Sequence, residues 1–365
     1  MPFEGSDGFL RSRNLQRYER RRMAIIDADA HVVENEYTWD FMLEEDKPHR
    51  PAILVPKEGH QTRAGEYWFV DGRVFGKDVN VGLDTDTVTR EATDVKKRLA
   101  HMDELGVSTH VLYPTIFLRP LTRHPEVEVA LARGYNRWLS NIWEQGEGRL
   151  RWAVIVPTSR MDIAIEEINF GAEHGACALF MRGIEGEYRP SDPYLYPLWE
   201  EAQRLNMPVC FHAAVGNFNF FDYFARDAGF STFKLPAVGA FHDIVMKQMH
   251  KKFPDLRWGF LEVSASWIPY VMNDISLRYG KQGISWPGRE LLEERQIFVA
   301  LQTADDIGYI VETAGEDNLV IGTDYGHNDT STELRALTNL RDNGGLSPAL
   351  ADKILDKNPK KLYAL

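Results

Sequence analysis

The chain has 365 residues, of which 44% are hydrophobic, and its formal net charge is -12. This length and apolar content are sufficient for one large domain with a sizeable core. The acidic balance argues against a nucleic-acid or anionic-membrane partner, because both require a basic surface. The chain has only two cysteines, which provide no disulfide framework. It contains no run of about 18 apolar residues, so we expect no membrane span. We recognise no secretory signal in its arginine-rich start. We therefore expect a cytoplasmic protein.

The first 90 residues contain an arm, a strand and an insertion. Residues 1–22 are polar and basic, and we expect them to form an arm outside a single domain that spans residues 23–365. The apolar segment 25–31 predicts the first strand. Between residues 45 and 90, the segments 51–56 and 67–75 are strand-like, with a turn at Asp71-Gly72. We interpret this region as a small inserted β unit.

From residue 92 onwards, helical and strand patterns alternate. Strands are predicted at residues 107–114, 150–157, 176–181, 208–212, 256–263, 296–301 and 319–323, and helices at residues 92–105, 127–145, 161–174, 197–205, 238–253, 268–279, 307–314 and 348–355. Apolar strands separated by helices predict a parallel sheet that is buried on both faces. Eight such strands fit a (β/α)8 TIM barrel. A doubly wound open sheet is the alternative, but no glycine-rich phosphate loop follows the first strand.

Four of the predicted strands end in a carboxylate or an imidazole. Asp29 and His31 are two residues apart on the first strand and share one of its faces. His212 ends the fifth strand, Glu262 the sixth and Asp324 the eighth. Catalytic groups of TIM barrels lie at these carboxyl ends. An Asp/His pair alone is also compatible with a structural hydrogen bond, but five converging ligand-type side chains predict a divalent-metal site.

The segments that carry these residues resemble the amidohydrolase superfamily. The most similar branch is the amidohydrolase-related one, which includes aminocarboxymuconate-semialdehyde decarboxylase and other non-oxidative decarboxylases. The resemblance covers about residues 24–360 and is carried by Ile26-Asp-Ala-Asp-Ala-His31, His212, Phe-Leu-Glu-Val-Ser-Ala-Ser-Trp-Ile-Pro at 260–269 and Gly-Thr-Asp-Tyr-Gly-His at 322–327. It implies a metal-dependent TIM-barrel enzyme.

The resemblance also implies roles for individual residues. Asp29 and His31 match the ligand pair of the first strand, and His212 matches the ligand of the fifth. Asp324 matches a carboxylate that contacts the metal and exchanges a proton with the attacking water. Two positions depart from the family pattern. Asp29 replaces the usual histidine, which favours Mn or Fe without excluding Zn, and Glu262 stands where the related decarboxylase has an active-site histidine.

The role of Glu262 remains open between three interpretations. It is a ligand of a second ion, a general acid or base, or a carboxylate that orients Arg182 or Trp267, and Trp267 is itself a candidate substrate contact. The fourth strand ends without a lysine that could bridge two ions. We therefore expect one divalent ion rather than two.

Further candidate substrate contacts follow the fourth, fifth and eighth strands. Arg182 is either a clamp for an anionic substrate group or the partner of Glu185 or Glu262. His327 is either a substrate contact or a surface-loop residue. A long loop after the fifth strand is rich in aromatic residues, which we expect to form a substrate wall, the core of a small subdomain or a homodimer contact: Phe218, Phe220, Phe221, Tyr223, Phe224, Phe230 and Phe233. Four polar or sulfur-containing residues are interpreted as structural: Asp27, His110, Cys210 and His242.

These residues predict an enzyme that acts on a small molecule. The expected reaction is hydrolysis of an amide, ester, thioester or lactone bond by metal-activated water, in a bulky and partly apolar compound. Asp324, together with Glu262, would take and return the proton. Non-oxidative decarboxylation of an aromatic or unsaturated carboxylic acid is the alternative reaction, in which Arg182 would assist. A non-catalytic ligand-binding barrel is the alternative from a different class.

Overall fold

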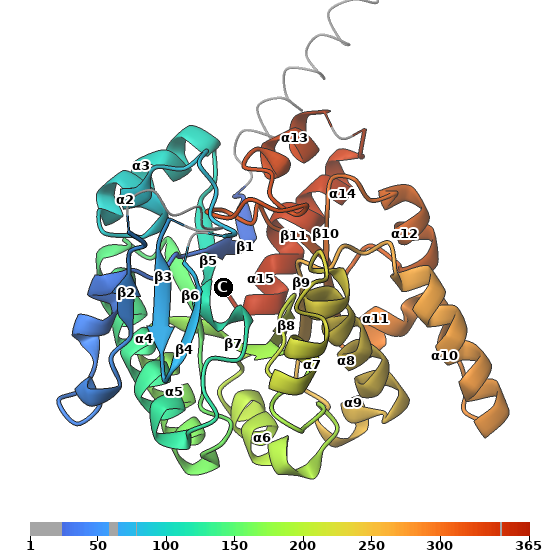
Figure 1. Cartoon of the computed structure of the whole chain (residues 1–365). Helices are drawn as coiled ribbons and strands as arrows, with labels where there is room; N and C mark the ends of the chain where they lie inside the picture. Colours follow the sequence, from blue (N-terminus) through green and yellow to red (C-terminus); the bar gives the residue numbers. More distant parts are fainter. Residues whose placement is uncertain (1–23, 58–64, 78, 344) are drawn as a thin grey trace, which may run out of the picture.

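The computed structural model describes residues 24–57, 65–77, 79–343 and 345–365, so the predicted arm, residues 1–22, lies outside the described residues. Eight parallel strands form one sheet that is nearly closed into a barrel, with helices between successive strands (Figure 1). The strands follow one another in chain order: β1 (Ile26–His31), β5 (Thr109–Tyr113), β6 (Leu150–Val154), β7 (Ala176–Arg182), β8 (Val209–His212), β9 (Trp258–Leu261), β10 (Ile297–Leu301) and β11 (Leu319–Ile321). The predicted (β/α)8 barrel is confirmed, and the open sheet is not found.

Each predicted helix is found, in some cases with shifted ends, and helices at residues 87–90, 218–223, 291–294, 336–343 and 358–363 were not predicted. The helices are α2 (Thr87–Arg90), α3 (Val95–Leu105), α4 (Pro125–Gln145), α5 (Met161–Glu173), α6 (Tyr196–Arg204), α7 (Phe218–Tyr223), α8 (Leu235–Met246), α9 (Met249–Lys252), α10 (Ile268–Gln282), α11 (Leu291–Glu294), α12 (Ile307–Ala314), α13 (Ala336–Asn343), α14 (Pro348–Asp352) and α15 (Asn358–Tyr363). The helix expected from residue 92 begins at Val95, because the Asp94 side chain caps it. The helix expected at 238–253 divides into α8 and α9 at Gln248, whose φ is 54°.

The insertion is an antiparallel sheet of three short strands, β2 (Ala52–Leu54), β3 (Tyr67–Val70) and β4 (Arg73–Gly76). Asp71 and Gly72 both have positive φ, as a tight type I′ hairpin requires. Trp68 points inwards and packs edge-on against Trp39 at a centroid distance of 6.1 Å. The inserted β unit predicted near residues 45–90 is therefore confirmed.

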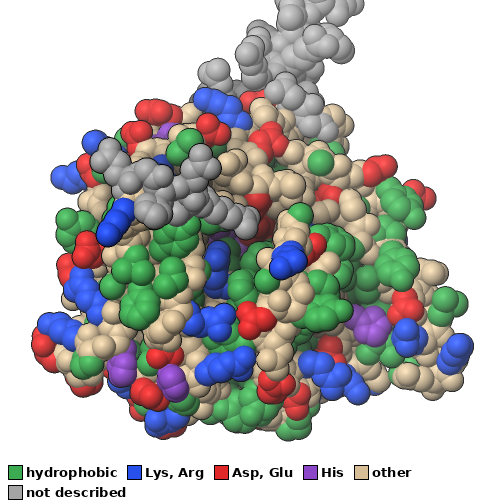
Figure 2. All heavy atoms as spheres, viewed as in Figure 1, with side chains coloured by type: hydrophobic (Ala, Val, Ile, Leu, Met, Phe, Trp, Pro, Cys, Tyr) green, Lys and Arg blue, Asp and Glu red, His purple; other side chains and the backbone are tan. Residues whose placement is uncertain are grey.

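The outer surface of the insertion and its flanks is apolar. Five side chains there are at least 41% exposed: Leu54, Val55, Phe69, Val74 and Val79. Figure 2 shows hydrophobic side chains gathered in this part of the molecule. Contiguous exposed apolar side chains are typical of surfaces that contact another molecule. The homodimer remains a prediction.

The segment after β8 is not a simple long loop. It contains α7 and a π-helical turn at Phe230–Lys234 before α8 begins. Its aromatic residues pack partly on one another, as Phe220 does against Phe224 at 4.9 Å between ring centroids. These contacts give the segment a small apolar cluster of its own. No helix among the described residues has both the length and the apolar composition to cross a membrane.

The barrel closes between β1 and the residues that follow β11. The backbone N–H of Asp324 donates to the carbonyl of Asp29 at 2.9 Å, and the N–H of His31 donates to the carbonyl of Tyr325 at 3.0 Å. Gly322 permits this approach, because a Cβ there would lie 2.3 Å from the Cβ of Asp29. The closure therefore fixes three predicted ligand residues relative to one another.

Asp27 holds the same seam from within β1. Its carboxylate accepts hydrogen bonds from the backbone N–H of Thr323 at 3.0 Å, from the Thr323 hydroxyl and from the backbone N–H of Asp29 at 3.2 Å. Burial raises the pKa of Asp27 to about 7. The hydrogen bonds from Thr323 favour the charged form and lower the pKa, but the effect of burial is larger. The prediction that Asp27 is a structural acceptor is confirmed.

We predict that Asp27→Asn changes the pH dependence of stability. Because the pKa of Asp27 is raised in the folded state, the unfolded chain loses this proton first as pH rises from about 4 to about 7. The free energy of unfolding of the wild type should fall relative to the variant over this window by more than about 1 kcal/mol. Urea unfolding at pH 4.5 and pH 8, with a metal chelator present, measures the difference. Parallel pH curves for the two proteins would contradict it.

Candidate metal centre and active site

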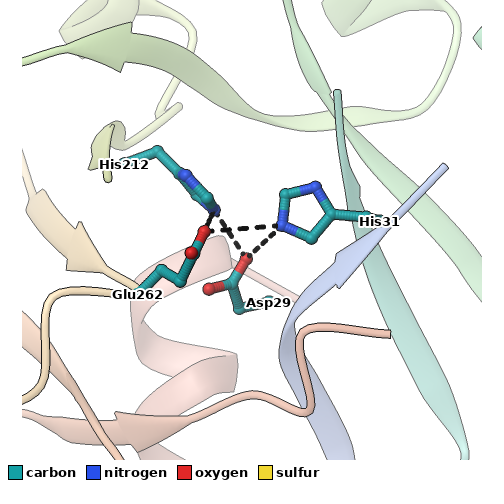
Figure 3. Close-up of side chains that lie close together, drawn as sticks. All are labelled: Asp29, His31, His212 and Glu262. Carbon is teal, nitrogen blue, oxygen red and sulfur yellow. Dashed lines mark hydrogen bonds and ion pairs between the residues drawn. The ribbon is translucent and has the colours of Figure 1, made fainter. Parts of the chain in front are cut away.

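Four predicted ligands converge at the carboxyl end of the barrel (Figure 3). Asp29 and His31 come from β1, His212 ends β8, and Glu262 directly follows β9. His212 Nε2 lies 3.0 Å from Asp29 Oδ1 and 3.2 Å from Glu262 Oε2. His31 Nε2 lies 3.5 Å from the same Asp29 oxygen and 3.9 Å from Glu262 Oε2. All four side chains are buried.

A second group overlaps the first and contains His31, Glu262, Asp324 and His327. Asp324 Oδ1 lies 3.3 Å from His31 Nε2 and 2.7 Å from His327 Nδ1. The other Asp324 oxygen accepts a hydrogen bond from the Thr332 hydroxyl at 2.6 Å. The two groups together contain all five predicted ligands. They also contain His327, which is buried and is not a surface-loop residue.

The backbone turns sharply where two of these side chains leave their strands. Glu262 has φ 59° and Asp324 has φ 53°, in the left-handed region that side chains other than glycine seldom adopt. Such conformations raise the free energy of the folded state by about 1–3 kcal/mol and are concentrated at functional sites. Here they begin directly after β9 and shortly after β11.

Two atoms of the first group are suited to a cation. His31 Nε2 and Glu262 Oε2 are buried and have no hydrogen-bond partner. The Nδ1–H of His31 donates to the carbonyl of Pro114 at 3.0 Å, which leaves the Nε2 lone pair directed at the carboxylates. Buried polar atoms are rarely left without a partner. The mixed imidazole and carboxylate set therefore fits a divalent ion such as Mn, Fe or Zn.

The buried charges shift the pKa values of the site in opposite directions. Burial raises the pKa of Asp324 to about 6. Burial and the nearby Asp324 carboxylate raise the pKa of Glu262 well above its usual value. Burial opposes ionisation of Asp29 as well, but His212 and His31 outweigh it and hold the pKa of Asp29 low. Burial lowers the pKa of His31 to about 3, so its imidazole is neutral, as a metal ligand must be.

His327 is arranged as a charged imidazolium. The Thr115 hydroxyl donates to the carbonyl of Val32 at 2.7 Å, so it accepts from the Nε2–H of His327 at 2.9 Å. The other ring nitrogen faces the Asp324 carboxylate and also carries a proton. Burial lowers the pKa of His327, but Asp324 outweighs burial and raises it overall. A proton-holding Asp324–His327 pair therefore adjoins the ligand cluster.

A cavity of about 370 Å³ lies beside the strand ends on the side of β5, β6 and β7. Its walls include the predicted substrate contacts Arg182 and Phe218, together with Tyr188 and Tyr194, whose rings stack at 4.2 Å. Arg182 donates to Glu185 at 3.0 Å, which decides between its two expected partners. The cavity has the size and partly aromatic lining of a small-molecule site.

The other predicted contact, Trp267, lies on the outer side of β9. Its indole N–H donates to the carbonyl of Ser264 at 2.7 Å, and its ring packs on Phe241 at 4.8 Å. It does not line the 370 Å³ cavity. Its role as a substrate contact therefore remains a prediction.

Two hydroxyl residues that contact the site, Thr115 and Thr332, are not among the residues predicted from the sequence. Thr115 directly follows the predicted strand 107–114, but a search of strand ends for carboxylates and imidazoles passes over a hydroxyl side chain. Thr332 lies eight residues beyond Asp324 in a segment without periodic pattern. No sequence signal identified it.

The fold and the site define a metal-dependent enzyme of the amidohydrolase superfamily. The sequence profile described as Amidohydrolase matches residues 26–365, so the chain belongs to this family. The predicted membership is confirmed. No curated protein sequence matches the chain significantly.

Solved structures with the same fold cover nearly the whole chain. An amidohydrolase from Mycobacterium avium subsp. paratuberculosis K-10 is 20% identical, with a TM-score of 0.73 and coverage of 94% of this chain and 99% of that one. A 5-carboxyvanillate decarboxylase from Novosphingobium aromaticivorans DSM 12444, in complex with manganese and 4-hydroxy-3-methoxy-5-nitrobenzoic acid, is 16% identical, with a TM-score of 0.67 and coverage of 94% and 97%. A 4-oxalomesaconate hydratase from Rhodopseudomonas palustris is 15% identical, with a TM-score of 0.60 and coverage of 93% and 95%.

We predict that Glu262→Gln weakens metal binding without destabilising the metal-free protein. Burial and the nearby Asp324 carboxylate raise the pKa of Glu262 and so favour its neutral form, and a neutral glutamine should therefore change the free energy of unfolding by less than about 1 kcal/mol. The affinity for Mn²⁺, measured by competition with a chelator, should fall at least about tenfold.

A matched control is Glu167→Gln. Glu167 is also buried, but it accepts hydrogen bonds from Arg137 at 3.1 Å and from Asn136 at 2.8 Å, away from the ligand cluster. This variant should lose about 1–3 kcal/mol of stability and keep its affinity for Mn²⁺. The reverse pattern in the two variants would argue against Glu262 as a ligand.

Proposed function

We propose that this protein is a divalent-metal-dependent, non-oxidative decarboxylase of an aromatic or unsaturated carboxylic acid. The observation that carries the proposal is the buried Asp324–His327 pair, which holds a proton beside the ligand cluster. The similarity in fold to a decarboxylase that binds manganese and a substituted benzoic acid supports the same reaction class. Hydrolysis of an acyl bond, which was the primary expectation from the sequence, becomes the second candidate.

Decarboxylation at an unsaturated carbon requires one proton and no water. The carbon that bears the carboxylate takes up a proton, the bond to the carboxylate breaks, and its electron pair restores the unsaturated system as carbon dioxide leaves. Asp324 Oδ1 can deliver this proton and be recharged by the Nδ1–H of His327, 2.7 Å away. Solvent then returns a proton to His327. The product retains every other substituent of the substrate.

The remaining residues bind and orient the substrate. A divalent ion held by Asp29, His31, His212 and Glu262 would bind the substrate carboxylate and an adjacent oxygen. The walls of the 370 Å³ cavity combine aromatic and aliphatic side chains with charged and hydroxyl groups, and they offer a surface for the rest of the molecule, with Phe218 on one side. Arg182 is already paired with Glu185, so we expect it to stabilise the wall of the cavity instead of binding an anionic group of the substrate.

The second candidate, acyl-bond hydrolysis, is favoured by one residue. Glu262 occupies the place where the related decarboxylase has an active-site histidine. A buried carboxyl group at this position, 3.2 Å from His212 Nε2, could take a proton from water and return it to a leaving group. The two reactions differ in the fate of solvent atoms, and this difference makes them easy to separate.

We predict carbon dioxide release from a panel of hydroxybenzoates by the manganese-loaded protein. In deuterium oxide, one deuteron should appear on the carbon that carried the carboxylate, because that proton comes from a group that exchanges with solvent. Mass spectrometry of the product measures it. A panel of aryl esters, amides and lactones in H₂¹⁸O tests the second candidate. Incorporation of ¹⁸O there, with no carbon dioxide from any acid, would replace decarboxylation by hydrolysis.

We predict that Asp324→Asn lowers kcat at least about 100-fold, because an amide cannot pass a proton from His327 to the substrate. Steady-state kinetics on protein with measured manganese content tests this. Asp306→Asn is the matched control, since Asp306 is an exposed helix cap of α12 and asparagine caps equally well. Full activity of Asp324→Asn at equal metal content would remove Asp324 from the proton path.

A further inference from the structure

Arg98 on α3 is a buried cation without an ion pair. Its residue surface is 1% exposed, and no carboxylate oxygen lies within 4.0 Å of its guanidinium among the described residues. Burial lowers the pKa of Arg98 only to about 10, so it is charged at neutral pH. The nearest counter-charge, Asp27, acts on Arg98 across His110, whose Nε2 lies 3.7 Å from Asp27 Oδ2. A buried charge without a direct ion pair destabilises a fold unless its hydrogen bonds are satisfied. The groups that Arg98 contacts therefore indicate its role.

The guanidinium contacts the backbone of a ligand residue directly. Nη1 donates to the carbonyl of His31 at 3.1 Å and to the carbonyl of Thr89 at 3.1 Å. Nη2 and Nε face His110 Nδ1 at 2.9 and 3.2 Å. The guanidinium carbon lies 3.7 Å from the centroid of the Tyr325 ring. The guanidinium thus connects α3 to β1, α2, β5 and the segment after β11.

Hydrogen bonds to its hydroxyl group also hold Tyr325 in this position. Its hydroxyl donates to Thr89 Oγ1 at 3.0 Å and lies 2.7 Å from His101 Nδ1. Its backbone carbonyl accepts the N–H of His31 at 3.0 Å. Tyr325 is fully buried and directly follows Asp324. The ring beneath Arg98 is therefore part of the seam that carries two ligand residues.

Together these contacts leave His31 one free polar atom. Its N–H is bound by Tyr325, its carbonyl by Arg98 and its Nδ1 by Pro114, and Nε2 alone is left for a ligand. We propose that Arg98 is a positioning residue of the metal centre, which fixes the backbone of His31 and the Tyr325 ring so that His31 Nε2 is directed at the carboxylate cluster. This inference rests on the metal centre and not on the reaction that the centre performs.

The positioning role depends on the shape of the arginine side chain and not on its charge alone. Arginine presents its donors in one rigid plane and stacks on an aromatic ring, whereas lysine is a point charge on a flexible chain. A lysine at position 98 cannot donate to His31, Thr89 and His110 while lying flat on Tyr325. The positioning role therefore predicts that the conservative variant fails to restore metal binding.

The test measures Mn²⁺ binding to the full, metal-free chain and needs no substrate. Arg98→Met should weaken Mn²⁺ binding about 10–100-fold, the usual effect of removing a residue that orients a ligand. The electron paramagnetic resonance spectrum of the bound ion should also change, because the position of one ligand changes. Arg98→Lys should bind Mn²⁺ as weakly as Arg98→Met. An unchanged dissociation constant in Arg98→Met, or full recovery in Arg98→Lys, would overturn the proposal.

Arg257→Met is the matched control. Arg257 also donates to backbone carbonyls, those of Leu362 at 2.8 Å and Asn206 at 2.6 Å, but it directly precedes β9 at the opposite end of the barrel. This variant should lose stability and keep its Mn²⁺ affinity. Equal weakening in Arg257→Met would reduce the effect of Arg98 to general stability and would overturn the proposal.

A milder variant covers the case in which Arg98→Met does not fold. Tyr325→Phe keeps the ring beneath the guanidinium and removes the hydroxyl that fixes the ring to Thr89 and His101. We expect Mn²⁺ binding about 2–5-fold weaker with little change in unfolding temperature. An unchanged affinity would show that the orientation of the ring does not matter and would contradict the proposal. Absence of decarboxylase activity in the wild type leaves all of these binding measurements valid.

Discussion

The burial of several ionisable side chains at the barrel mouth is the constraint on which the rest of this structure depends. Ligand atoms of Glu262 lie within 4.8 Å of those of Asp29 and of Asp324, and all three side chains are removed from water. Carboxylates in such surroundings repel one another and lose their hydration, so each needs a proton, a cation or a donor. The structure favours a proton on Glu262, whose pKa is raised, and places hydrogen-bond partners at Asp29 and Asp324.

The same constraint explains why the supporting residues are so fully engaged. His31 is held at every polar atom except Nε2, and Asp324 is held at both oxygens. Side chains fixed in this way bind an ion with little loss of conformational freedom, which favours affinity and geometric selectivity. Left-handed backbone at Glu262 and Asp324 and a buried cation at Arg98 both raise the free energy of the folded state, and all three residues lie in or beside the same ligand cluster.

The chemistry of the site depends on where its mobile protons lie. His327 shares hydrogen bonds with Asp324 and Thr115, so a charged ring is stabilised beside the ligand cluster instead of serving as a further neutral ligand. Glu262, like Asp29, departs from the pattern that the family resemblance implies. A carboxyl group there adds negative charge when ionised and a second proton when neutral, so it affects both the ion and the reaction. Fold similarity alone does not distinguish between these reactions, because unrelated activities share this barrel.

The sequence by itself determined the barrel fold and the site residues that lie at the ends of its strands, because both depend on local patterns. Alternating apolar strands and helices specify the (β/α)8 order, and the two-residue period of β1 places Asp29 and His31 on one face. The residues that follow successive parallel strands must meet at one end, so His212, Glu262 and Asp324 were also predictable. Only the tertiary structure decided which distant groups meet: Arg182 with Glu185, His327 with Thr115, and Arg98 with the backbone of His31. Such contacts depend on side-chain orientation and on the packing between strands and helices, and no spacing along the chain records them.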